Sequence, residues 1–466
     1  MTTDQALAAD VTPASPDRPP ELDSYRPIGQ TILFGVQHVL VMAATPISSV
    51  FLISGALKLG PELTAQLLAA TLVFSGIGSI LQSQGVGPFG PKLPFVMLPG
   101  GAPVILFISI AQAKGVQVAV GAVMLTAVFY FVVLPIFQRL LRFFPTLVIG
   151  TMITVVGINL VKIGAQLIFG KPGTPTFGNG PGIILGLSTI GFTVLAVLFG
   201  RGFIARVAPI IGLLAGTVLV ILMGVAHVGD PLKNGLIAVP QPMPFGMPEF
   251  DLLAALPLLI FSIASMAEAT GQTSINAEAV GARIDLAKTA PKTIRADALV
   301  SFAGSFFGMP LMVTSGENVG IVRMTGVKSR YVTVAAGIIL IAAGLFAPLV
   351  QLITIIPDAV VGGTAVVVFG VIVVLGIQML GRIDLHDHAT MVIVAVSIGL
   401  GLMPVLLANP YVAAPAPLRM ILENAVAMSA FTAVILNALF NHGPLGAWRR
   451  RTREAASGAT NDGASS

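Results

Sequence analysis

Two acidic side chains lie deep within apolar sequence, where a charge is costly to place. Glu268 stands in the stretch LPLLIFSIASMAEATGQTSIN, and Glu317 stands in FFGMPLMVTSGENVGIVRMTGVKSR. A carboxylate at the centre of a bilayer costs roughly 2.5–3.5 kcal/mol on insertion scales, so an acid there is a functional candidate by default. Gln272 follows Glu268 by four residues, which puts both side chains on one face of a helix. The three groups could hydrogen-bond a polar ligand; contacts that serve packing alone are the alternative for Glu268 and Gln272.

The segment that carries Glu317 is broken by Pro310, Gly316 and Gly320 and is too short for a straight helical span. The matching segment in the first half is KLPFVMLPGGAPVILFISI. It is broken by prolines and glycines, among them Gly101, which Ala102 follows. Non-helical backbone at membrane depth is tolerated only where it is buried in protein or lines a cavity. Two interrupted segments at matching positions therefore indicate a transporter built from inverted repeats, with substrate bound where the freed amide groups meet. A surface loop between two spans is the alternative for the Glu317 segment.

A single histidine lies inside apolar sequence. His38 follows Gln37 in LFGVQHVLVMAATP, whereas the other histidines lie in loops or at span ends. Histidine titrates near pH 6.5 when unperturbed, so His38 could take part in proton movement. A histidine on an apolar face also serves as a structural hydrogen-bond donor, and both roles stay open.

The composition places nearly the whole chain in lipid. Of the 466 residues, 55% are hydrophobic and 10% are charged, against about 25% charged residues in an ordinary soluble domain. The mean hydropathy is +0.94. The absence of cysteine excludes disulfides, thiolate metal sites and cysteine catalysis, and five histidines leave little scope for a metal centre. We therefore expect neither an enzyme nor a cofactor, and the thinly spread net charge of +5 argues against a nucleic-acid partner.

The apolar runs predict fourteen membrane spans between polar ends. With both termini in the cytoplasm, most of the 25 basic residues fall on the cytoplasmic side, as the positive-inside rule requires. Three of the spans are short or broken, at 94–112, 296–311 and 314–326. The long spans are predicted at 28–54, 64–86, 116–137, 146–163, 183–200, 206–227, 252–277, 333–356, 360–380, 388–406 and 418–440.

One motif resembles a known signature. Glu317-Asn318-Val319-Gly320-Ile321-Val322-Arg323-Met324-Thr325-Gly326 is similar to the signature of the nucleobase–ascorbate transporter family. Gln37-His38 resembles the paired Gln-His of that family's first span. Glu268 resembles its acidic residue in the eighth span, and Asp297 resembles the one in the ninth. The resemblance runs from about Pro27 to Asn441.

The resemblance implies an all-α polytopic membrane fold in the bacterial inner (plasma) membrane. Its fourteen segments form two inverted seven-span repeats, with short β-strands in the broken spans 3 and 10. Spans 1–4 (27–138) and 8–11 (252–356) would form a core domain, and spans 5–7 (139–227) and 12–14 (357–441) a gate domain. A homodimer through the gate domains is implied. Residues 1–26 are expected to be a disordered cytoplasmic tail, and residues 442–466 a second cytoplasmic tail.

The resemblance also implies secondary active import of a nucleobase by alternating access, coupled to protons, with Na⁺ as the alternative ion. Glu317 favours uracil, whereas the stretch from Met324 to Val332 is similar to that of xanthine and urate members. Phe95 and Phe369 are the candidates for stacking on the base. An anion exchanger of similar seven-plus-seven architecture is the rival function, although two buried acids would repel an anion. The expected substrate-binding residues are Glu268, Glu317, Gln272, Gly316, Asn318, Gly101 and Ala102, with His38, Gln37, Asp297 and Glu268 supporting the site or carrying the proton.

Overall fold

The structure is a computed structural model of the 466-residue chain. It describes residues 19–137, 145–170, 177–224, 235–315, 322, 326–354, 356–407, 410–415, 419, 422–423 and 425–442.

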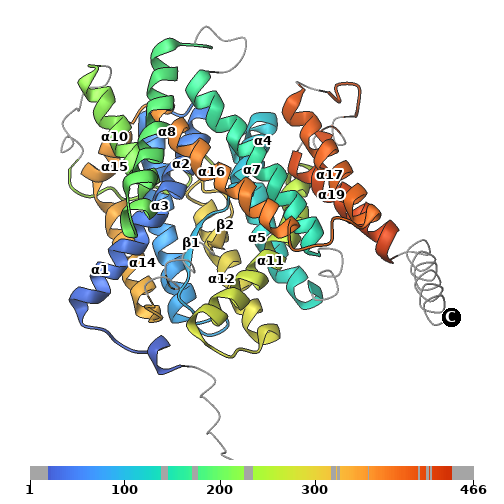
Figure 1. The fold of residues 1–466 in the computed structure, drawn as a ribbon, viewed down its shortest axis with the longest axis horizontal. Coiled ribbons are helices and arrows are strands. Elements are labelled where there is room, and N and C mark those ends of the chain that lie inside the picture. Colours follow the sequence, from blue (N-terminus) through green and yellow to red (C-terminus); the bar gives the residue numbers. More distant parts are fainter. Residues whose placement is uncertain are drawn as a thin grey trace, which may run out of the picture.

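Apolar helices make up most of the described chain (Figure 1). Eight of them are long and apolar enough to cross a membrane, counting 28–57 as one, and four shorter apolar helices accompany them. The predicted total of fourteen spans stays a prediction. In chain order the elements are η1 (Pro20–Leu22), α1 (Ile28–Met42), α2 (Ala44–Leu57), α3 (Pro61–Gln84), β1 (Val96–Pro99), α4 (Gly101–Lys114), α5 (Val116–Val133), η2 (Leu134–Ile136), α7 (Thr146–Phe169), α8 (Gly180–Phe199), α9 (Phe203–Arg206), α10 (Ala208–Leu222), α11 (Leu252–Val280), α12 (Leu286–Ser305), β2 (Met312–Ser315), α14 (Arg330–Leu345), α15 (Ala347–Thr354), α16 (Asp358–Leu380), α17 (His388–Leu406), α19 (Ala425–Asn437) and the π-helical turn η3 (Ala438–His442).

The two broken segments each contain a short strand, as the fold implied by the resemblance requires. β1 and β2 pair antiparallel, with Val96 opposite Ser315 and Pro99 opposite Met312. The strand β1 ends at Pro99 and α4 begins at Gly101, because proline lacks the N–H group that a longer ladder would need. Figure 1 shows the strand pair near the centre of the molecule, surrounded by helices.

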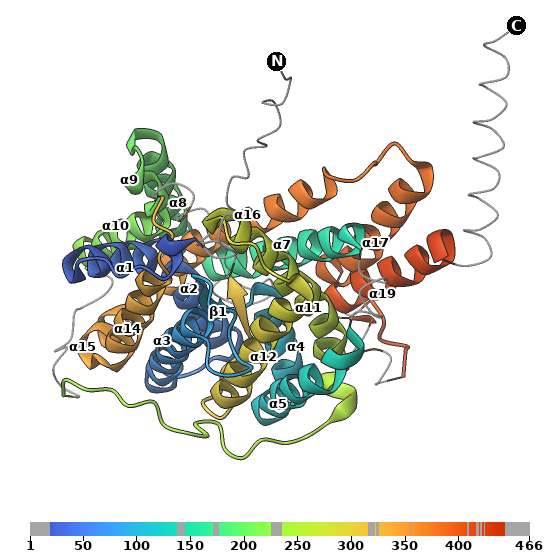
Figure 2. The same ribbon diagram turned by 90° about the horizontal axis from the view of Figure 1, so that it is seen from below.

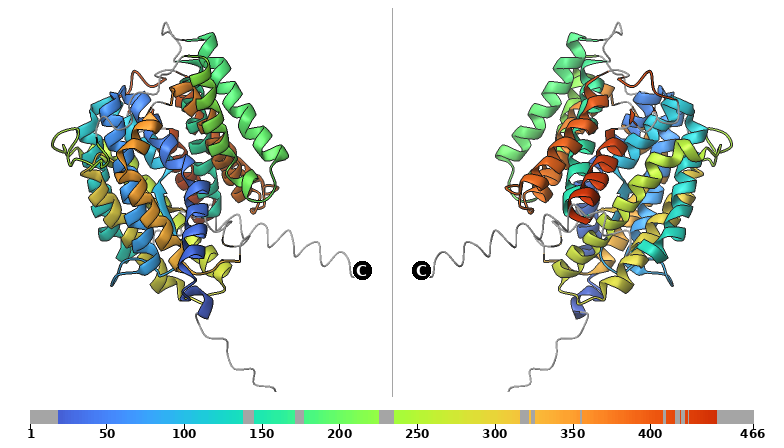
Figure 3. Two further views of the ribbon diagram at one scale, coloured as in Figure 1. Left: turned by 90° about the vertical axis from the view of Figure 1, so that its left-hand side faces the viewer. Right: turned by 90° about the vertical axis from the view of Figure 1, so that its right-hand side faces the viewer.

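The helices pack into two groups that lie side by side (Figure 3). The first group surrounds the strand pair and consists of α1–α5, α11, α12, α14 and α15; the second consists of α7, α8, α10, α16, α17 and α19. The groups meet where α4 contacts α7 and where α2 contacts α16. The strand pair therefore belongs to the first group, and the N-terminal end of α4 adjoins the second.

The boundary of one predicted span is wrong. The ninth span was predicted at 296–311, but α12 begins at Leu286 and ends at Ser305. The Asp285 side chain accepts a hydrogen bond from the backbone N–H of Lys288 at 3.3 Å and so caps the helix. A search for apolar runs misses this start, because the first turns carry Lys288, Lys292 and Arg295.

The prediction that all of residues 1–26 form a disordered tail is also wrong. Residues 20–22 form the short helix η1, and Leu22 is fully buried. Composition alone gave no sign of this contact, because the partners of Leu22 lie far along the sequence.

A long connection, residues 235–251, crosses one end of the first group before α11 begins (Figure 2). Its backbone is hydrogen-bonded to three helices in turn: Ala238 donates to Leu345, Met243 to Phe306, and Glu249 to Gln117. These bonds hold the ends of α14, α12 and α5 together.

Candidate functional site

The N-terminal end of α4 presents backbone donors in the middle of the molecule. Gly100 donates its N–H to Leu311, which continues the strand pairing, and the helix begins at the next residue. Among the described residues, no acceptor takes the N–H groups of Gly101 or Ala102. The first N–H groups of a helix lack intrahelical partners and carry partial positive charge, so they suit a carbonyl oxygen of a ligand.

Gly101 stands where the two helix groups meet. A side-chain carbon at this position would lie 3.0 Å from Leu160 of α7 and 3.1 Å from Ile372 of α16. A larger residue would be tight against both side-chain ends, so glycine suits this close approach of α4 to the second group. The free amide groups of α4 lie at the junction between the groups.

One face of α11 is accessible although the helix is otherwise largely buried. Glu268 and Gln272 are partly exposed, whereas Ala267, Ala269 and Thr273 are buried. Gly271 lies between them, and a side chain added there would meet no heavy atom of the described residues within 4 Å. Glu268, Gly271 and Gln272 therefore face space that no described residue fills.

The helix α11 packs against both the strand pair and α4. Asn276 of α11 donates its amide N–H to the carbonyl of Pro94 at 2.8 Å, which fixes α11 beside the residues that precede β1. The same helix contacts β2 and α4. The helix that carries Glu268 therefore adjoins the segment that carries Gly101.

Asp297 is the centre of a fully buried polar network. Its Oδ1 atom accepts hydrogen bonds from Gln82 Nε2 at 2.9 Å and from Thr314 Oγ1 at 2.5 Å. Gln82 Nε2 also lies 2.6 Å from Thr314 Oγ1 and 3.1 Å from the carbonyl of Thr293. Thr293 in turn shares a hydroxyl hydrogen bond of 2.8 Å with Thr273 on α11. The network joins α3, α11 and α12 to β2, so Asp297 braces the strand, and its part in carrying the proton stays a prediction.

Sequence reasoning missed the hydroxyl groups that hold the strands. Ser79 Oγ accepts the N–H of Met97 in β1 at 3.0 Å. Ser301 Oγ accepts the N–H of Met312 at 2.9 Å and donates to the carbonyl of the same residue at 3.1 Å. The signal that could have found them is the polar run of α3, in which Ser75, Ser79 and Gln82 recur on one face of an apolar helix.

Three of the predicted residues, Gly316, Glu317 and Asn318, lie outside the described residues. Gln37 and His38 lie on α1, where Gln37 is partly exposed and His38 is buried. The Nδ1 atom of His38 has no hydrogen-bond partner among the described residues. The described part of the structure therefore links neither residue to Glu268 or Asp297.

The two aromatic candidates differ in position. Phe95 is fully buried and belongs to the same apolar cluster as Leu22, at the start of β1. The cluster leaves no ring face of Phe95 exposed, and stacking of either ring on the base stays a prediction. Phe369 is also fully buried, but it lies on α16 within one turn of Ile372, which adjoins Gly101.

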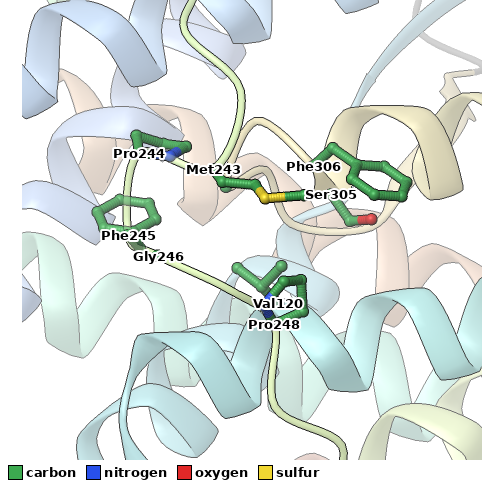
Figure 4. Close-up of a pocket in the computed structure, with 9 residues that line it drawn as sticks. Val120, Met243, Pro244, Phe245, Gly246, Pro248, Ser305 and Phe306 are labelled. Carbon is green, nitrogen blue, oxygen red and sulfur yellow. The ribbon is translucent and has the colours of Figure 1, made fainter.

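An apolar hollow lies away from these groups, under the connection 235–251 (Figure 4). An adjoining space of about 360 Å³ lies between the connection and α5. Carbon-rich side chains line both, and no charged group of the described residues lines either of them. The one polar side chain among the described residues that line it is Ser305, whose hydroxyl group already donates to the carbonyl of Phe302. The chemistry is therefore concentrated at α11, the strand pair and α4.

Comparisons of sequence place the chain among known permeases. It is 32% identical over 416 residues to the xanthine permease of Bacillus subtilis (strain 168), covering 89% of this chain and 94% of the relative. It is 31% identical over 430 residues to the uric acid transporter UacT of Escherichia coli (strain K12), covering 91% and 89%. It is 31% identical over 435 residues to the nucleobase transporter PlUacP of Paenibacillus larvae, covering 93% and 98%.

Solved structures share the fold at much lower identity. The murine anion transporter Slc26a9 in its inward-facing state superimposes with a TM-score of 0.59 at 14% identity, covering 91% of this chain and 70% of that one. The transmembrane domain of the cyanobacterial bicarbonate transporter BicA gives 0.53 at 15% identity, covering 89% and 98%. These likenesses support the seven-plus-seven membrane fold and leave the ligand open.

The family assignment rests on a match to a family description over most of the chain. Residues 29–409 match the permease family Xan_ur_permease, which spans all of the elements that surround the strand pair. The same family was indicated by the motif beginning at Glu317. The chain is therefore a membrane permease rather than an enzyme, and it belongs to the Xan_ur_permease family, the nucleobase–ascorbate transporters.

Proposed function

We propose that the protein is a proton-coupled importer of an oxopurine, such as xanthine or urate. The observation that carries this is the Glu268 carboxyl group, partly exposed beside Gly271 on a helix that packs against α4. An oxopurine is flat and has N–H donors on one edge and carbonyl acceptors on another. The site offers acceptors on α11 and donors on α4, which is the complementary arrangement.

Each group has a distinct part in holding the base. Glu268 accepts ring N–H groups, most strongly while its carboxyl group is ionised. Gln272, one turn along the same face, offers a carbonyl and an amide group to the adjoining edge. Gly101 and Ala102 donate their N–H groups to a ring carbonyl. The curated relatives carry names of xanthine and uric acid permeases, which favours an oxopurine over uracil.

Proton coupling is proposed from the surroundings of Glu268. Among the described residues, none hydrogen-bonds the Glu268 carboxyl group and no lysine or arginine pairs with it. A buried carboxylate without a cation is most readily neutralised by a proton. Binding of base and proton at one carboxyl group would couple their movement. A sodium ion would need several further oxygen ligands around Glu268.

Alternating access is proposed for the two helix groups, acting as core and gate. The site lies on the first group and faces α7 and α16 of the second through Gly101. Rocking of one group against the other would open the site to each side in turn. We further propose the bacterial inner membrane, with both termini cytoplasmic, and a homodimer through the gate group.

The rival function is anion exchange, which the fold likeness to anion transporters could suggest. That likeness is at 14–15% identity and concerns architecture alone. A Glu268 carboxylate beside the ligand would repel an inorganic anion, which has no ring N–H group to offset that repulsion.

The test is uptake of radiolabelled xanthine into proteoliposomes under an imposed inward proton gradient. Unlabelled xanthine, urate, hypoxanthine, guanine and uracil compete in parallel. We expect uptake to follow the gradient, to collapse with a protonophore, and to be displaced by xanthine or urate better than by uracil. Uptake that ignores the gradient and responds to sulfate or bicarbonate would establish the exchanger instead.

The residue-level test is Glu268→Gln. We expect it to abolish uptake, because it removes a charge-assisted bond worth about 1.5–3 kcal/mol and the proton carrier together. Glu249→Gln, in the exposed connection, is the matched control and should transport like the parent. Glu317→Gln is expected to change the preference among bases more than the rate. Normal gradient-driven uptake by Glu268→Gln would exclude this site.

A further inference from the structure

The segment 20–26, here called the N-terminal anchor, is packed against the part of the chain that carries the strands. Leu22 is fully buried in an apolar cluster. Phe95 of this cluster immediately precedes β1, and Val322 follows β2 along the chain. The remaining buried members are Leu93, Ala277, Val280 and Ala282. One side chain from the N-terminal end thus shares a core with both flanks of the strand pair.

Polar contacts hold the N-terminal anchor from the other side. Arg330 Nε donates to Asp23 Oδ1 at 2.5 Å, and Arg330 Nη1 donates to the carbonyl of Ser83 at 3.0 Å. The Ser329 hydroxyl donates to the carbonyl of Ser24 at 2.7 Å. Arg330 thereby satisfies a carbonyl at the C-terminal end of α3, which has no helical partner, while it binds the anchor.

An aromatic pair completes the attachment. The rings of Tyr25 and Tyr331 stack with centroids 4.1 Å apart and planes 20° from parallel. Arg330 also lies over the Tyr331 ring, 4.8 Å from its centroid. Apolar burial, charge-assisted hydrogen bonds and ring stacking therefore all hold the seven residues of the N-terminal anchor in place. A tail that is only tethered to the helices would need none of these contacts.

A short series of contacts connects Leu22 to the proposed site. Ala277 of the cluster follows Asn276, whose amide group holds the carbonyl of Pro94, and Phe95 follows Pro94. Movement of Phe95 shifts the start of β1, and β1 leads into Gly101 at the start of α4. The Leu22 cluster therefore sets where β1 begins relative to α11.

We propose that the N-terminal anchor is a positioning element of the transport site, with Leu22 as its central residue. It holds the two flanks of the strand pair so that the amide groups of α4 keep their spacing from Glu268. Leu22 itself touches no substrate. The proposal rests on the proposed function for its transport readout, and a second readout is independent of any substrate.

The first test compares Leu22→Ala with Leu22→Met in proteoliposomes. Leu22→Ala leaves a cavity beside Phe95, and we expect KM for xanthine to rise about fivefold with the maximal rate per folded transporter retained. Leu22→Met refills the space and should restore KM. Ile28→Ala, at a position 80% exposed, is the matched control and should not change KM. A Leu22→Ala protein with parental KM would overturn the proposal; if that variant does not fold, Leu22→Val carries the same test.

The second test is amide hydrogen exchange in the purified protein without substrate. In Leu22→Ala we expect faster exchange at residues 96–98 and 312–315, and no change in α17. Unchanged exchange in the strands would overturn the proposal whatever the protein transports. If the parent fails to take up any base while the strands still loosen, the proposed function fails and the positioning role stands.

A cross-linking experiment tests whether the N-terminal anchor stays docked throughout the transport cycle or has to detach. The chain has no cysteine, so Tyr25→Cys with Tyr331→Cys can be joined by a short bismaleimide without background labelling. We expect efficient cross-linking and transport equal to that of the uncross-linked double variant. Loss of transport on cross-linking would mean that the anchor has to detach during the cycle. No cross-linking in the folded protein would mean that the anchor is not docked. Either result would overturn the proposal.

Discussion

At the scale of single residues, the Thr314 hydroxyl group has a clearly defined role. It donates to Asp297 at 2.5 Å and lies 2.6 Å from the Gln82 amide. Thr314→Val keeps the shape but leaves the buried carboxyl group short of a donor, at a cost of about 1–3 kcal/mol. We expect a lower melting temperature and weaker xanthine binding, both restored by Thr314→Ser. Equal melting temperatures for the valine and serine variants would contradict this role.

The open space beside Gly271 gives a second prediction at this scale. Gly271→Leu should fill that space between Glu268 and Gln272 and block binding of the base, while the fold stays intact because no described atom lies within 4 Å. Gly191→Leu, on α8, meets no described atom either and is the matched control. Binding is measured by the shift in melting temperature that xanthine produces. A normal shift for Gly271→Leu would show that the base binds elsewhere.

The roles of single residues could be predicted from the sequence to different extents. Glu268 and Asp297 stand out because acids are rare and costly inside apolar sequence. Ser79 and Ser301 do not, since a serine in an apolar helix can bond its own backbone and so occurs without any special role. Gln82 lies between these cases. Its partners come from two later segments, α12 and β2, and no pattern within α3 names them.

At the scale of elements, glycines set how closely helices cross. A side-chain carbon at Gly76 of α3 would lie 2.3 Å from the carbonyl oxygen of Gly337 in α14. Backbone cannot move aside cheaply, so Gly76→Ala should destabilise the protein by about 1–3 kcal/mol. Gly29→Ala, where no described atom lies within 4 Å, should instead be neutral or slightly stabilising. Thermal unfolding in detergent measures both, and equal melting temperatures would contradict the close crossing.

The start of α11 supplies a pH-dependent prediction. Asp251 lies just before the helix and accepts the N–H groups of Ala254 and Leu253, each at 3.0 Å, and Lys114 lies 3.5 Å away. The Ala254 N–H foremost, and then Lys114, hold the pKa of Asp251 below its ordinary value. A lowered pKa means that this stabilisation is complete above about pH 4 and is lost as the pH falls through the folded-state pKa.

Asp251→Ala should therefore lower stability by about 1 kcal/mol at pH 7, because the helix loses its cap. The difference in melting temperature from the parent should shrink below about pH 4. Glu249→Ala, two residues earlier in the exposed connection, controls for the lost negative charge. A difference that is constant down to pH 3 would contradict the assignment.

Helices and strands could be predicted where the sequence pattern that defines them is local. The breaks in the third and tenth spans follow from proline and glycine near Gly101 and Pro310, and each break contains a strand. The start of α12 was missed because its cap and charged first turns lie outside the apolar run. The N-terminal anchor was missed because Leu22 is buried by residues 93–95, 277–282 and 322, a contact that no local pattern encodes.

At the scale of the whole molecule, one fold serves unlike ligands. The chain shares its architecture with an anion transporter and a bicarbonate transporter at 14–15% identity. The side chain proposed to distinguish its ligand is Glu268, on the helix α11 that packs against α4. Fold class therefore followed from composition and breaks, whereas the ligand class depends on a few side chains.

The pairing of β1 with β2 has a consequence for how the protein is made. The first strand is synthesised roughly 200 residues before its partner, which at about 5–20 residues per second is a delay of about 10 to 40 seconds. Until then its edge is unpaired at the centre of the bilayer, where exposed N–H and C=O groups are costly. The early half must therefore be sheltered, by the insertion machinery or by its own helices, until the late half arrives.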